Sequence, residues 1–124
     1  MYAAYQFAHW DDTSDPEVAA YLEAMHGSSE DPRSENVVWG YSTVMWIRTV
    51  ADTIGADNLN PQSLANFMRT QNGVPIPLSR ELVNPGPAGE PQMKHPYVHI
   101  SQWLNGKLNT VQVAGATDGW VKAF

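Results

Sequence analysis

The pattern of apolar and polar positions predicts one long amphipathic helix from Ser34 to Gly55. At helical pitch its apolar residues gather on one broad face and its polar residues gather opposite. Asp31-Pro32 and Ser34 favour a helix start, and Gly55 favours a left-handed stop. The expected core face comprises Trp39, Gly40, Thr43, Val44, Trp46, Ile47, Val50, Ala51 and Ile54, and the expected polar face comprises Ser42, Arg48, Thr49, Asp52 and Thr53.

Three apolar residues, Val38, Tyr41 and Met45, lie on the side of this helix that is otherwise polar. Their position predicts that the first half of the helix is covered from two directions. One interpretation is that a neighbouring loop, such as the Pro-rich one further along the chain, covers them. The other is that the helix start faces a ligand cleft or a partner subunit, as apolar clusters that include a phenol often do.

Two further elements precede the long helix. Residues Tyr2 to His9 alternate and are rich in aromatic side chains, which predicts a strand. Asp15 followed by Pro16 is typical of a helix start, so we expect a helix that continues to His26 and ends at Gly27.

After the long helix, Asn60-Pro61 repeats the capping signal and predicts a third helix that ends before Asn72-Gly73. Residues 74 to 96 contain six prolines, which break regular elements, so we expect an irregular loop that is functional or lies over the surface.

The C-terminal part carries the strongest short-range signal of the chain. Asn105-Gly106 separates the alternating stretch Tyr97 to Leu104 from the stretch Leu108 to Val113, which predicts a β-hairpin. Asp118-Gly119 then predicts a turn before a short apolar strand or tail, which contains Trp120, Val121 and Phe124. The elements together predict the α/β class, α+β as an isolated piece, with three helices, one N-terminal strand and a C-terminal hairpin in a single domain or fragment that spans residues 1–124.

Composition narrows the functional classes. The chain has 124 residues, 43% of them apolar, so it is long enough to bury a core. A net charge of -6 without any cluster of Lys or Arg argues against nucleic acid as a partner. The absence of Cys excludes disulfides and thiolate chemistry. No signal peptide is recognisable, and the strand pattern that follows Met1 directly favours a piece of a longer protein.

The residues that suggest chemistry have simpler explanations. The acidic stretch 11–17 lacks the spacing of a calcium loop, so capping and solvation explain it better. His95 and His99 are four apart on an expected strand, where we expect exposed histidines rather than a metal pair. A small hydrolase that uses Asp11 or Asp12 with His9 is a remote alternative. We therefore predict no catalytic residue, no metal and no cofactor.

The order of the segments resembles a known family. An N-terminal strand, Asp15-Pro16-Glu17-Val18 at the start of a helix, Gly40-Tyr41 in a long helix, a Pro-capped short helix and the run Tyr97 to Lys107 together resemble the C-terminal third of an extracytoplasmic solute-binding protein. The resemblance is to the leucine/isoleucine/valine-binding type that serves ABC-type importers, and it covers nearly the whole chain.

This resemblance implies a function without bond making or breaking. In such proteins two α/β lobes, joined by three crossover strands, close on an amino acid or a similar small molecule, and a membrane permease receives it. It also implies a periplasmic or extracellular location, either free or anchored as a lipoprotein. The strand near Tyr5 and the hairpin at Asn105-Gly106 would lie near the hinge. By position, the resemblance implies that Val37, Val38 and Tyr41 bind the ligand.

Two features depart from the family pattern. Ser42 stands where the family commonly has Asp, and the Pro-rich stretch 74–96 replaces a Gly-rich strand. Because most of the family's ligand contacts come from earlier parts of a longer chain, we expect the isolated piece to be marginally stable or to self-associate. The alternative function is an independent acidic protein-interaction module without catalytic activity.

Overall fold

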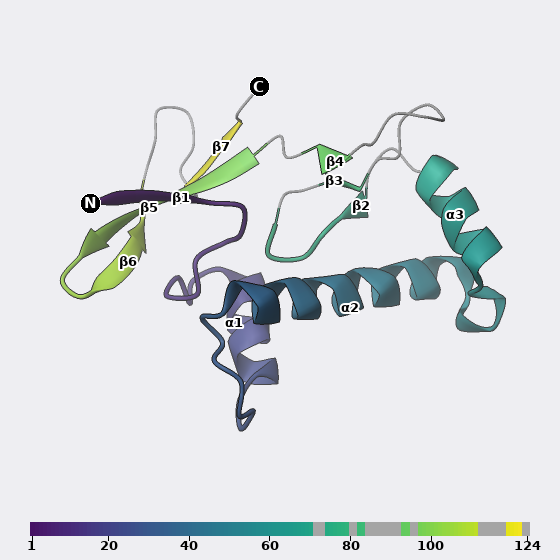
Figure 1. The fold of residues 1–124 in the computed structure, drawn as a ribbon, viewed down its shortest axis with the longest axis horizontal. Coiled ribbons are helices and arrows are strands. Elements are labelled where there is room, and N and C mark those ends of the chain that lie inside the picture. The colour runs from purple at the N-terminus through teal and green to yellow at the C-terminus, as the bar shows by residue number, and fades with distance from the viewer. Residues whose placement is uncertain (71–73, 80–81, 84–92, 95–96, 112–118, 123–124) are drawn as a thin grey trace.

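The computed structural model describes residues 1–70, 74–79, 82–83, 93–94, 97–111 and 119–122 (Figure 1). In these ranges the chain forms helices and antiparallel strands, which confirms the predicted mixed α/β class. The helices are α1 (Pro16–Ala24), α2 (Glu35–Ile54), the short 3-10 helix η1 (Ala56–Asn58) and α3 (Pro61–Thr70), and the strands are β1 (Tyr2–Tyr5), β2 (Val74–Pro75), β3 (Leu82–Val83), β4 (Met93–Lys94), β5 (Tyr97–Leu104), β6 (Lys107–Thr110) and β7 (Trp120–Lys122).

The larger sheet is built around β5. Strand β1 pairs with one edge of β5, while β6 and β7 pair with different parts of the other edge, all antiparallel. Asn105 and Gly106 have φ values of 54° and 77°, which suits a two-residue hairpin turn and confirms the predicted hairpin. Strand β6 ends at Thr110, and the predicted strand residues 112–113, like Asp118 and Phe124, lie outside the described residues.

The second sheet corrects one prediction. The stretch 74–96, expected to lack regular structure, contributes the two-residue strands β2, β3 and β4, which pair antiparallel in that order. Strands of two residues give almost no periodic signal, and Pro75 within β2 is a residue that normally argues against a strand.

The first strand is shorter than predicted. The alternation of residues 2–9 predicted a strand to His9, but β1 ends at Tyr5. Phe7, Ala8 and His9 are all buried, which alternation of a strand on a sheet surface does not allow. The chain instead turns at this point, so that three consecutive side chains enter the core.

Helices α1, α2 and α3 begin where the sequence predicted, while α1 ends at Ala24, two residues before the predicted end at His26. The Asp15 side chain accepts a hydrogen bond of 2.8 Å from the Glu17 backbone N–H and so caps α1. Helix α2 begins directly after Ser34 and ends at Gly55, although the Ser34 side chain makes no capping bond. Figure 1 shows α2 running from the larger sheet at one end of the molecule to α3 at the other.

The face of α2 that packs inward differs from the predicted one. The buried residues are Val38, Ser42, Trp46 and Val50, which recur every four positions. Val44, expected in the core, is 65% exposed, and Ile47 is 40% exposed. Contact along a row of residues four apart is a common mode of helix packing. The side of α2 that is covered is therefore rotated toward Val38 and Ser42.

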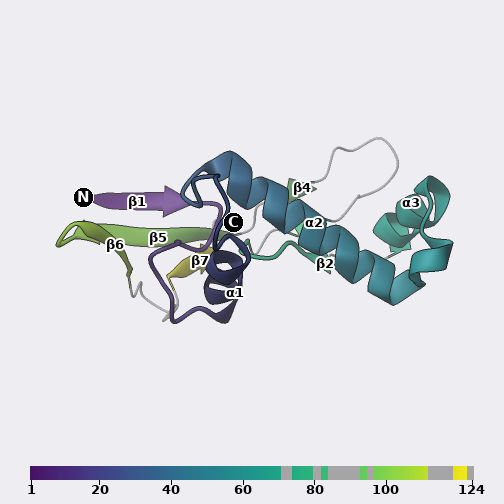
Figure 2. The ribbon, with the colours of Figure 1, turned by 90° about the horizontal axis from the view of Figure 1, so that it is seen from below.

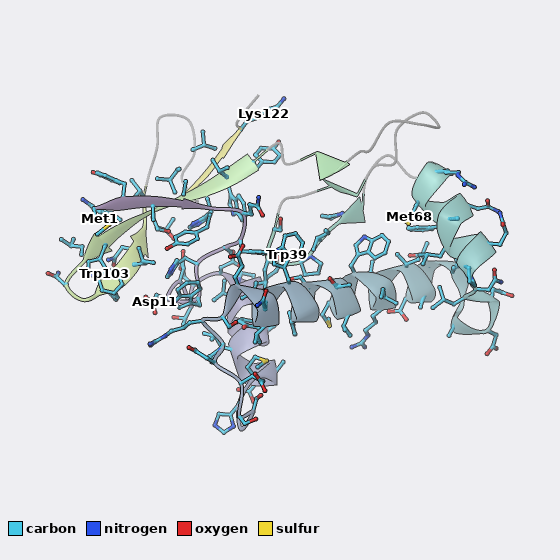
Figure 3. All side chains as sticks on the ribbon, in the orientation of Figure 1. Met1, Asp11, Trp39, Met68, Trp103 and Lys122 are labelled. Atoms are coloured by element: carbon cyan, nitrogen blue, oxygen red, sulfur yellow. The ribbon has the colours of Figure 1, made fainter. Side chains whose placement is uncertain are left out.

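Two apolar clusters hold the elements together. The first joins α1, the start of α2 and the sheet through Phe7, Ala8, Val18, Tyr21, Val38, Leu78 and Trp120. The second joins α2 and α3 through Trp46, Val50, Phe67 and Ile76. Trp39, labelled in Figure 3, packs against both clusters. Figure 2 shows the start of α2 close to α1 and the sheet, which is where the first cluster lies.

Candidate functional site

A cavity of about 220 Å³ lies where the turn after β1 meets the start of α2. Residues 5–10 form one wall, and Arg33, Glu35 and Val38 form the other. The local sequence explains the position: β1 must end before the buried residues 7–9, and the turn that follows leaves space beside the first turn of α2.

Three aromatic rings on the first wall contact one another. The ring of His9 lies 4.2 Å from that of Trp10 and 5.6 Å from that of Tyr5, measured between centroids. The rings of Tyr5 and Trp10 meet edge to face at 6.0 Å. Aromatic groups packed in this way provide an apolar surface with well-defined geometry. The cavity therefore combines an aromatic wall with two charged residues.

The structure brings only one of the three expected ligand-binding residues to this cavity. Val38 lines it and is also part of the first apolar cluster. Val37 and Tyr41 are half-buried and pack against that cluster, with the Tyr41 ring edge to face against Tyr21 at 5.0 Å. The sequence predicted that a second part of the chain covers Val38 and Tyr41. In the structure α1, residues 7–8 and Leu78 pack around them.

His9 is almost fully buried and neutral at pH 7. Its Nδ1 accepts a hydrogen bond of 3.2 Å from the Asp11 backbone N–H, so the ring proton resides on Nε2. Burial lowers the pKa of His9 to about 4 from 6.5, although the nearby Asp11 carboxylate opposes this shift. Nε2 is buried and has no hydrogen-bond partner among the residues that the structure describes. The ring therefore acts as an apolar surface rather than as a base at neutral pH.

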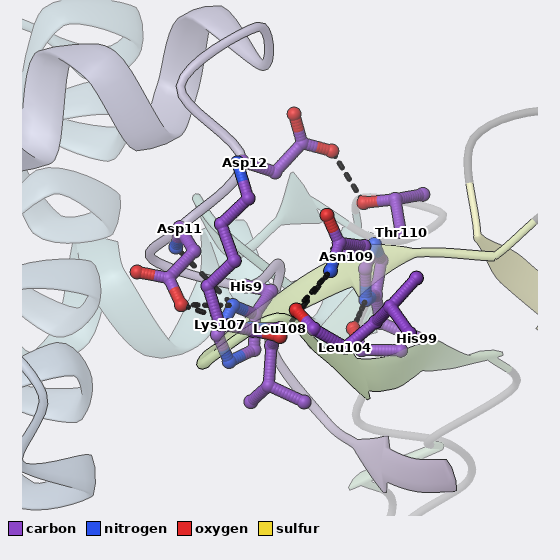
Figure 4. A network of polar contacts seen from close by, with 10 residues as sticks. His9, Asp11, Asp12, His99, Leu104, Lys107, Leu108, Asn109 and Thr110 are labelled. Atoms are coloured by element: carbon purple, nitrogen blue, oxygen red, sulfur yellow. Dashed lines mark hydrogen bonds and ion pairs between the residues drawn. The ribbon is translucent and has the colours of Figure 1, made fainter. Parts of the chain in front are cut away.

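The acidic turn after His9 is partly exposed and is bonded to the sheet (Figure 4). Asp11 Oδ2 accepts a hydrogen bond of 3.1 Å from the Leu108 backbone N–H, and Thr110 Oγ1 donates to Asp12 Oδ2. The open groove of about 640 Å³ between this turn and β6 is thus lined by carboxylates that already have partners. Capping, one of the two explanations expected for the acidic stretch, is confirmed for Asp15. Asp11 and Asp12 remain partly exposed and, in addition, bond to β6.

These bonds also affect the acidity of the turn. Burial alone would raise the pKa of Asp12, but hydrogen bonds from Ser14 and Thr110 hold it below its ordinary value. The carboxylate that fastens the turn to β6 is therefore stabilised in its charged form.

His99 differs from the expected exposed strand histidine. It is 2% exposed, its Nδ1 lies 3.2 Å from Ser101 Oγ, and its ring packs edge to face against Trp120. Gly119 leaves room for this ring, because a Cβ there would lie 2.7 Å from His99 Nε2. His95 lies outside the described residues. In the part of the chain that the structure describes, no group of three or more His, Asp or Glu residues is arranged to hold a metal ion.

Sequence reasoning missed most of the cavity. A cluster of aromatic residues at Tyr5, Phe7, His9 and Trp10 was visible in the sequence, but it was interpreted as part of a strand. Arg33 and Glu35 gave no signal, because charged residues beside a helix start are common.

Comparison with known proteins gives no relative. No protein-family model, no curated protein and no solved structure matches the chain. Among the described helices, none has the length and apolar character needed to cross a membrane.

Proposed function

We propose that this chain is the C-terminal portion of the solute-binding component of an ABC-type importer. The complete protein captures an amino acid or a similar small molecule outside the cytoplasmic membrane and delivers it to a membrane permease. The proposal requires no cofactor and no covalent step: binding and release follow from closure of two lobes around a hinge.

The cavity at the start of α2 carries this proposal. The family resemblance assigns ligand contacts to the start of the Gly-Tyr helix, and the cavity lies beside that helix start with Val38 in its wall. Pairing of β1 with β5, which is distant in sequence, also supports it, because the resemblance expects both strands near the hinge.

The exposed side of α2 is consistent with a missing part of a lobe. Val44 and Ile47 are exposed on the same helix in which Ser42 and Val50 are fully buried. Under the proposal this side packs against the remainder of the first lobe. The isolated chain should then self-associate, which sedimentation at increasing protein concentration would detect.

Thermal melting of the encoded protein that contains this chain tests the function. A panel of the common amino acids and related small acids, amines and amides is added one at a time. A solute at a hundred times its dissociation constant stabilises the folded state by about 2.7 kcal/mol, which raises the midpoint by roughly five to ten degrees for lobes of about 150–250 residues. A panel in which no solute raises the midpoint would overturn the proposal.

A further inference from the structure

We propose that the cavity beside the start of α2 binds a small carboxylic acid with a single aromatic ring, held by Arg33 through its carboxylate and by the rings of Tyr5 and Trp10. This inference rests on the proposed function and specifies the class of solute. It is carried by the shape, lining and charge of the cavity.

The size of the cavity suits one ring. Apolar cavities of about 150 Å³ bind benzene. The cavity here has a volume of about 220 Å³, so a six-membered ring fits with space for a short acidic arm. Larger bicyclic bodies would have to displace the wall.

The wall favours an aromatic body over an aliphatic one. Tyr5, His9 and Trp10 contact one another pairwise and form a continuous aromatic surface, and Val38 also lines the cavity. Pairs of aromatic rings attract one another more strongly than the area that they bury accounts for. The His9 ring adds no charge to this surface at pH 7, since burial lowers its pKa to about 4.

Arg33 supplies the polar part of the recognition. This residue lines the cavity and forms no ion pair with any residue that the structure describes. A guanidinium matches a carboxylate with two parallel hydrogen bonds, which gives orientation as well as affinity. Over long distances the net charge of -6 repels acids, but at contact the paired guanidinium dominates.

Glu35 would contact an aromatic amino acid but not an aryl acid without an amine. It lies two positions after Arg33, lines the same cavity and is also without an ion pair among the described residues. An aromatic amino acid would place its ammonium group near Glu35 and its carboxylate at Arg33. An aryl acid without an amine would use Arg33 alone. The shared chemistry is one ring and one carboxylate.

Nuclear magnetic resonance of the ¹⁵N-labelled encoded protein that contains this chain tests the inference, because the method detects weak binding. The probes are 3-phenylpropionate, phenylalanine, the neutral alcohol 3-phenylpropanol and the aliphatic acid isovalerate. We expect saturable shifts of the Trp10 indole N–H and the Val38 amide with the two aryl acids. The alcohol and the aliphatic acid should bind at least about tenfold more weakly.

Substitutions identify the groups responsible. Arg33→Gln should weaken binding of 3-phenylpropionate about tenfold or more and bring it to the level of 3-phenylpropanol. Arg48→Gln is the matched control, because Arg48 is an exposed arginine on α2 away from the cavity, and it should leave affinity unchanged. If phenylalanine binds more tightly than 3-phenylpropionate, and Glu35→Gln removes this difference, the solute is an aromatic amino acid. If 3-phenylpropionate binds more tightly than phenylalanine, the solute is an aryl acid without an amine.

Several results would overturn the inference. These are equal affinity for isovalerate and 3-phenylpropionate, shifts confined to residues away from the cavity, absence of binding by either aryl acid, or an unchanged affinity in Arg33→Gln. If the aryl acids fail while another solute raises the melting midpoint of the encoded protein, only this inference falls and the proposed function stands.

Discussion

Acidification should destabilise this protein through His9. The ring is almost fully buried, and its pKa falls to about 4 in the folded chain from 6.5. Because the folded pKa is the lower one, the unfolded chain binds more protons between these two values, and stability falls as the pH falls. The contribution is fully present above pH 6.5 and is lost on the way to pH 4.

The magnitude follows from the two pKa values. One pH unit inside this window corresponds to about 1.4 kcal/mol. Integration gives a loss of about 2 kcal/mol at pH 5 and roughly 3 kcal/mol near pH 4. Asp11 and Asp12 attract the protonated ring, and His99 disfavours it, but burial is the largest effect.

Urea unfolding followed by tryptophan fluorescence at several pH values measures this loss. His9→Asn is the informative variant: its side-chain oxygen can still accept the Asp11 N–H, but it does not titrate. We expect the variant to lose about 2 kcal/mol less than the parent between pH 7 and pH 5. His26→Asn, at an exposed position after α1, should keep the parent's pH dependence.

Parallel loss of stability in the parent and in His9→Asn would refute this reasoning. It would mean that the His9 ring becomes solvated without cost on protonation, or that carboxylates of the acidic turn dominate the acid response.

Three further predictions concern the fold and are measured by urea unfolding at pH 7. Gly119→Ala should lower the free energy of unfolding by more than about 2 kcal/mol, because φ is 77° and a Cβ would lie 2.7 Å from two side-chain atoms. Gly27→Ala, with a φ of 81° and open space around it, should lower it by about 1 kcal/mol. Equal losses in the two variants would contradict the packing argument. Asp15→Ala should cost about 1 kcal/mol through loss of the α1 cap, and Ser34→Ala, which removes no capping bond, should cost much less; the reverse order would show that the caps are misassigned. Tyr21→Phe should cost about 1 kcal/mol, because its hydroxyl donates a hydrogen bond of 2.6 Å to a backbone carbonyl of the following loop, and a neutral substitution would mean that water replaces this bond.

Local signals in the sequence predicted the elements that depend on local interactions. The helix that begins after Asp15 and the turn at Asn105-Gly106 follow from side chains within a few residues, so both predictions hold. The end of α2 at Gly55 is of the same kind.

Contacts between distant residues could not be predicted in this way. The covered side of α2 depends on where α1, residue 78 and α3 lie, so Ser42 is buried and Val44 is exposed against expectation. The bond from the Leu108 N–H to Asp11 joins residues far apart in the sequence. Neither residue carries a pattern that specifies the partner. The sequence did not predict the cavity for the same reason, since Arg33 and Tyr5 line one cavity only after α2 packs beside the turn.

Under the proposed function, a small solute is bound and released unchanged. A mass balance measures this: the encoded protein is incubated with a stabilising solute, separated by ultrafiltration and then denatured, and the solute is quantified and identified. We expect retention of one solute per protein molecule, recovered in its original chemical form. Recovery of a converted product, or no retention of any solute that was tested, would contradict it.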